Sequence, residues 1–168
     1  MDAIGLLREA HARVPELARR AAEGLTPEQL AWAPAEGANP IGWLVWHLAR
    51  GQDAQVAEVA GATQVYLEGD WAACFGREPD PDDTGYGHGP EDVRAVRPES
   101  ADALLDYLDA VHAATAAWLG TLAPADLDRV VDEGWDPPVT LGARLVSIVD
   151  DDVQHAGQAA YVRGLLGA

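Results

Sequence analysis

The last long segment of the chain, residues 139–166, constrains the fold most strongly. Its sequence is VTLGARLVSIVDDDVQHAGQAAYVRGLL, and its apolar residues recur at helical spacing. They form one stripe: Leu141, Leu145, Ile148, Ala159, Val162 and Leu166. Asp152 and His155 fall on that stripe, and Asp151 lies just beside it. The pattern predicts one long helix that carries titratable groups on the face it buries.

Asp151 and His155 are four residues apart, so their side chains share a helix face and can meet at one point. A charge on an apolar stripe is costly unless it is paired or bound to a metal. Two interpretations follow: a neutral core histidine with a carboxylate partner, or part of a metal site. From these residues alone, the paired core histidine is the preferred interpretation.

The rest of the chain predicts three more long helices and no strand. Capping residues and apolar stripes place the four helices at residues 2–22, 41–61, 101–122 and 139–166. Asp2, Ser100 and Thr140 are the predicted N-caps, and Asn39-Pro40 opens the second helix. Shorter helical turns are predicted at 26–32, 68–75 and 124–128. The expected fold is an all-α four-helix bundle that occupies residues 1–168 as a single domain.

Residues 62–99 contain no long regular element, so a long crossover should join the second and third helices. Within it, residues 77–90 read REPDPDDTGYGHGP, a composition rich in turn-forming residues that predicts a loop. His88 stands between two glycines and could reach over a pocket. A solvated loop histidine is the alternative.

Composition excludes several classes of protein. The chain has 28 acidic residues and 11 basic ones, all arginine, for a formal net charge of −17. Such a surface repels nucleic acid and anionic membranes. The N-terminus lacks the apolar core of a signal peptide, no apolar run approaches a membrane span of about 18 residues, and Cys74 has no disulfide partner. The expected location is the cytoplasm, and Cys74 is interpreted as incidental.

The sequence contains no nucleotide-binding loop, no Gly-x-Ser-x-Gly and no cysteine pair, so histidines and carboxylates must supply any chemistry. His47, Asp151 and His155 fit a metal site built from inward side chains on facing helices. Asp152 is the alternative carboxylate. The ordinary interpretation of His47 is a partly exposed histidine shielded by Trp43. Two imidazoles and one carboxylate suit a divalent ion, with zinc preferred and nickel, iron or manganese as alternatives.

Three segments resemble the DinB-like superfamily, especially actinobacterial members related to mycothiol-dependent transferases and maleylpyruvate isomerase. They are NPIGWLVWHLARGQD, DTGYGHG and WDPPVTLGARLVSIVDDDVQHAGQAAYVRGLL. The resemblance implies a four-helix bundle in which a histidine on the second helix and a His-x-x-x-His pair on the fourth bind a divalent metal. By position His47 matches the first histidine and His155 the last, while Asp151 replaces the middle one. With the resemblance, metal binding becomes the preferred interpretation of His47 and His155.

The resemblance also implies a function. Several members are transferases or isomerases that use mycothiol or bacillithiol, so a metal-dependent S-transferase acting on a small thiol and an electrophile is expected. Arg50, Arg163 and His88 are the candidate contacts to thiol or substrate. The alternative is a non-catalytic, stress-associated metal-binding bundle. A homodimer is also expected, partly because Trp46 lies outside the main apolar stripe of its helix.

Overall fold

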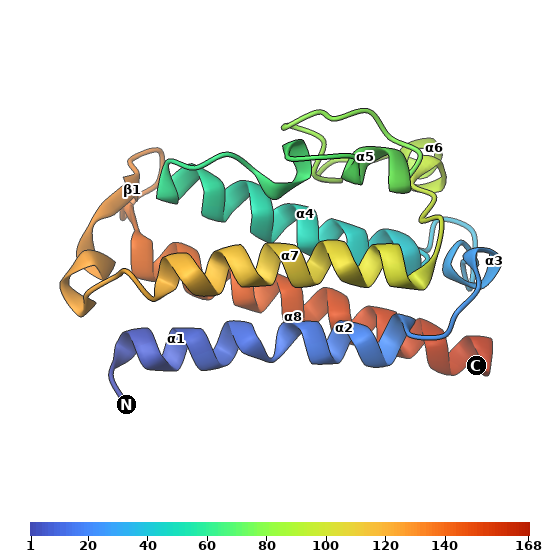
Figure 1. Ribbon diagram of the computed structural model, residues 1–168, viewed down its shortest axis with the longest axis horizontal. Coiled ribbons are helices and arrows are strands. Elements are labelled where there is room, and N and C mark those ends of the chain that lie inside the picture. Colours follow the sequence, from blue (N-terminus) through green and yellow to red (C-terminus); the bar gives the residue numbers. More distant parts are fainter.

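The computed structural model describes residues 1–168 and consists of an all-α four-helix bundle (Figure 1). The long helices are α1 (Ala3–Ala12) with α2 (Val14–Ala22), then α4 (Ile41–Ala60), α7 (Ala101–Leu119) and α8 (Leu141–Leu166). Short helices complete the chain: α3 (Pro27–Leu30), η1 (Val65–Leu67), α5 (Trp71–Cys74), α6 (Pro90–Ala95) and η2 (Pro124–Asp128). The predicted fold class and the long crossover between α4 and α7 are confirmed. No helix is both long and apolar enough to cross a membrane.

The predicted first helix differs from the structure because it is divided into α1 and α2. Asp2 caps α1 as expected, accepting a hydrogen bond from the Gly5 amide at 2.8 Å. The division falls at Arg13, whose amide bonds back to the Ala10 carbonyl at 3.3 Å. Pro15 follows in the first turn of α2. Because proline has no amide hydrogen to donate one turn back, the helical ladder is interrupted there.

The other helix ends follow the sequence signals closely. Thr26 forms a capping box with Gln29 at the start of α3. Ser100 accepts a hydrogen bond from the Ala103 amide, and Thr140 accepts one from the Ala143 amide. Gly61 ends α4 in the left-handed conformation, with φ +65°.

The expectation that the chain contains no strand is wrong in one place. β1 (Val130–Asp132) and β2 (Val139–Thr140) pair antiparallel and form a two-stranded hairpin before α8. Both strands are mostly β-branched residues, which favour extended backbone. The ladder continues into the helix, where the Leu141 amide donates to the Arg129 carbonyl at 2.8 Å.

Helix α4 is the centre of the fold, since it packs against α8, α7, α2 and the crossover. Fourteen of its twenty residues are buried, so its surface is covered almost all round. Trp46 is among them, fully buried within the main core cluster. This corrects the expectation that Trp46 supplies a dimer surface. In Figure 1 the crossover, with α5 and α6, lies over α4.

Candidate metal centre

Three side chains from two facing helices converge on one point. His47 comes from α4, while Asp151 and His155 come from successive turns of α8. One ligand atom from each lies within 4.8 Å of the others. The ring centroids of the two histidines are 4.7 Å apart and nearly perpendicular, at 76°. The structure therefore brings together the three predicted metal-ligating residues.

The hydrogen bonds of the two imidazoles leave the nitrogens facing the cluster available. His47 Nδ1 lies 2.5 Å from the backbone carbonyl of Thr84, and because a carbonyl can only accept, Nδ1 carries the hydrogen. His155 Nδ1 pairs with the Gln158 side-chain oxygen at 3.0 Å, and its Nε2 lies 3.5 Å from Asp151 Oδ1. Outer partners of this kind fix the tautomer of metal-ligating histidines.

The cluster also shifts the acidity of its members. Burial, more than any other cause, lowers the pKa of His47, with the nearby His155 opposing its charge further. The hydrogen bond between Asp151 and His155 lowers the pKa of the carboxyl and raises that of the imidazole. His47 is therefore held neutral, and Asp151 is held ionised. These are the protonation states that a metal ligand requires.

An aromatic wall holds His47 on one side. The Trp43 ring stacks on the imidazole with centroids 4.6 Å apart and an interplanar angle of 18°. Trp43 Nε1 donates to His88 Nδ1 at 3.2 Å, and His88 Nε2 bonds to Asp83 Oδ1 at 2.9 Å. His88 is thus mostly buried and supports Trp43, which excludes the solvated-loop alternative. It is not one of the three converging residues.

Gly85 allows the crossover to approach this close. Its φ is +89°, and a Cβ built there would lie 2.7 Å from His47 Nδ1, 3.0 Å from the Trp46 ring and 3.1 Å from the Trp43 ring. Only glycine fits without displacing His47. The sequence signal was present in the glycine-rich segment around His88, but it did not indicate which glycine faces the site. The Thr84 carbonyl and Gln158 were not predicted at all.

Asp152, the alternative carboxylate, faces the core instead of the cluster. It is 1% exposed, and neither of its oxygens has a hydrogen-bond partner. Burial, reinforced by the charge of Asp151, raises its pKa well above the ordinary value. Of the two neighbouring aspartates, only Asp151 is placed to meet His47.

Arg50 does not face the site, which corrects the expectation that it contacts a ligand. The side chain is fully buried and lies 4.0 Å above the Tyr66 ring. Its guanidinium donates to six acceptors at 3.0–3.4 Å: Asp53, Gln64, Tyr107 and the backbone carbonyls of Asp80, Pro81 and Asp83. Every donor is occupied, so Arg50 fastens the crossover to α4.

Arg163 is also away from the site. It lies two turns beyond His155 on α8, where it donates to the Glu23 carbonyl at 2.9 Å and the Ala168 carbonyl at 3.2 Å. These bonds satisfy carbonyls beyond the ends of α2 and α8. The expected contact between Arg163 and a thiol or substrate is therefore replaced by a structural contact.

Comparison with known proteins places these observations in a family. A family model described as the DinB superfamily matches residues 10–159. A crystal structure titled a conserved protein of locus from Enterococcus faecalis is 32% identical, with a TM-score of 0.91, over 100% of this chain and 99% of that one. No curated protein matches the sequence. Because the family model spans most of the chain, the protein belongs to the DinB superfamily.

Proposed function

We propose that the protein is a divalent-metal-dependent transferase that joins a low-molecular-weight thiol of the mycothiol type to an electrophile. The observation that carries this proposal is the convergence of His47, Asp151 and His155 within 4.8 Å. Membership of the DinB superfamily supports it, because the resemblance noted above includes thiol-dependent transferases.

The three side chains fit a divalent ion. Two imidazoles and one carboxylate form a nitrogen and oxygen donor set that suits zinc first, with nickel, iron and manganese also compatible. The Thr84 carbonyl and Gln158 orient the two imidazoles from outside. Three protein ligands leave at least one coordination position for a small molecule.

When bound, a divalent ion at these ligands would hold a thiol in its deprotonated, nucleophilic form near neutral pH. The protein itself positions the three side chains and shields His47 from water on one side. Trp43 stacks on His47 and excludes water from one side of the imidazole. Asp151 is half-exposed, so the cluster stays open to solvent on the side of α8. Cys74 takes no part, because the reacting thiol arrives with the small molecule.

The proposal is tested by measuring metal content and thiol consumption on the same preparations. We expect protein purified without chelator to carry about one divalent ion per chain and to consume mycothiol with monochlorobimane as electrophile. His155→Ala should lose both the ion and the turnover. His112→Ala is the matched control, since His112 is a half-buried histidine on α7 outside the cluster.

The competing function is a non-catalytic, stress-associated bundle in which the ion only stabilises helix packing. It predicts no thiol consumption above background at any metal loading. It also predicts that His47→Ala lowers the melting temperature in proportion to the metal lost. That pair of results would replace the transferase proposal.

A further inference from the structure

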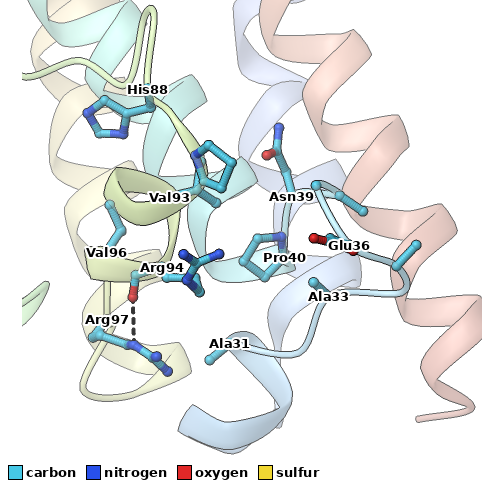
Figure 2. Close-up of a pocket in the computed structure, with 14 residues that line it drawn as sticks. Ala31, Ala33, Glu36, Asn39, Pro40, His88, Val93, Arg94, Val96 and Arg97 are labelled. Carbon is cyan, nitrogen blue, oxygen red and sulfur yellow. Dashed lines mark hydrogen bonds between the residues drawn. The ribbon is translucent and has the colours of Figure 1, made fainter.

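A cavity lies between α6 and the loop that joins α3 to α4. Its volume is about 360 Å³, which is the size of a small-molecule site. Figure 2 shows Asn39 and Pro40 on one wall and Arg94 opposite Pro40, while Arg97 extends toward Ala31 and His88 lines the cavity at its edge. His88 also accepts the hydrogen bond from Trp43, the residue stacked on His47. Two side chains, His88 and Trp43, therefore connect this cavity to His47.

The two arginines of this cavity lack acidic partners in a chain rich in them. Acidic residues outnumber arginines by 28 to 11, and most arginines pair with a carboxylate. Arg94 forms no ion pair, and the only hydrogen bond from the Arg97 side chain goes to the Arg94 backbone carbonyl at 2.8 Å. In Figure 2 the side chain of Arg94 extends from α6, and that of Arg97 extends from the segment just after α6. Two guanidinium groups thus stand at one cavity with unused donors.

From this arrangement we infer that the cavity binds the carboxylate of a small acidic molecule that reacts at the metal centre. Guanidinium groups match a carboxylate through paired N–H donors. The net charge of −17 repels anions from most of the surface, so an acidic ligand needs a local positive site. The cavity lining also includes one carboxylate, Glu36, so the two arginines leave one positive charge in excess. The link to reaction at the metal centre rests on the proposed function, whereas binding in the cavity does not.

Titration calorimetry with succinate as the probe tests the inference. We expect one succinate per chain, with a Kd weakened at least tenfold in the double variant Arg94→Gln/Arg97→Gln. Both arginines are exposed, so the variant should fold, and its circular dichroism should match the parent. Arg8→Gln is the matched control, because Arg8 is exposed on α1 and also without an ion pair. Glu36→Gln should tighten binding severalfold by removing the opposing charge.

Two further titrations test whether binding depends on the charge of the ligand and on the metal centre. Succinamide, which has the same shape without charge, should not bind. His155→Ala should bind succinate as the parent does, so a failed metal centre leaves this result unaffected. The inference is overturned if succinate does not bind, if the double variant binds it unchanged, or if Arg8→Gln loses as much affinity.

Discussion

Asp151 and His155 lie one turn apart on α8, with a carboxylate oxygen 3.5 Å from the imidazole Nε2. The adjacent Asp152 points into the core, where it has no partner. The two aspartates therefore carry the same functional group, but their side chains point in different directions. They provide an internal comparison for the proposed metal centre.

We predict that Asp151→Asn weakens zinc binding at least tenfold, because it removes the only charged ligand, whereas Asp152→Asn leaves zinc affinity unchanged. Competition with a chromophoric chelator measures both. Asp152→Asn should in addition raise the melting temperature, since it removes a group whose charged form burial disfavours. Equal loss of zinc in the two variants would contradict the assignment of Asp151.

The close approach of Gly85 to His47 predicts a specific effect of a single methyl group. Gly85→Ala should lower zinc affinity at least tenfold, because the new Cβ would displace His47 from the Thr84 carbonyl. Gly87→Ala is the control: its φ is +77°, so it carries similar backbone strain, but a Cβ there meets nothing within 4 Å. Equal zinc affinity in the two variants would contradict the claim that Gly85 is required for the position of His47.

Arg50→Met should destabilise the fold by about 3–5 kcal/mol, because Asp53 would be left as a buried charge without its cation. Arg50 and Asp53 are 0% and 4% exposed, so solvent does not screen their interaction. Urea unfolding measures the change. Arg8→Met, at an exposed position, should change stability by less than about 0.5 kcal/mol.

Because His11 is buried, we predict that the free energy of unfolding decreases in mild acid. Burial, with a smaller effect from His112, lowers its pKa from 6.5 to about 4. His11 therefore binds a proton more tightly in the unfolded chain than in the folded one. The contribution of neutral His11 to folding stability is complete above about pH 6.5 and is lost as the pH falls toward about 4. The difference corresponds to about 3 kcal/mol. His11→Leu should flatten the dependence of urea unfolding on pH in this window, and an unchanged slope would contradict the buried neutral state.

A homodimer remains a prediction from the family resemblance. Helix α8 also exposes four large apolar side chains, Val146, Val153, Tyr161 and Leu165. Light scattering at micromolar concentration should give about twice the chain mass of 17.8 kDa, and Val153→Arg should reduce it. A monomer mass for the parent protein would contradict the prediction.

Local signals explain why much of the fold could be predicted from sequence. Ser100, Thr140 and Gly61 act on backbone groups within one turn of themselves, so neighbouring residues suffice to identify them. The pairing of Asp151 with His155 is local in the same sense. The hairpin of β1 and β2 was missed because two short strands carry too few residues to show an alternating pattern.

The errors at the site have one physical cause. Arg50 lies one turn from His47, and periodicity alone suggests that both reach the same ligand. In the fold the crossover covers α4, and irregular backbone supplies the acceptors that take Arg50 away from the site. Backbone carbonyls such as that of Thr84 leave no residue pattern in the sequence, so these partners could not be predicted.

Two side chains of α4 hold the same stretch of the crossover. Arg50 binds the carbonyls of Asp80, Pro81 and Asp83, and His47 binds that of Thr84. This stretch is therefore fixed to the helix that carries His47, and it cannot move away as a hinged lid without breaking four hydrogen bonds to its backbone. Under the proposed function, small molecules would reach the cluster from the side of α8, where Asp151 is half-exposed, while the crossover stays fixed.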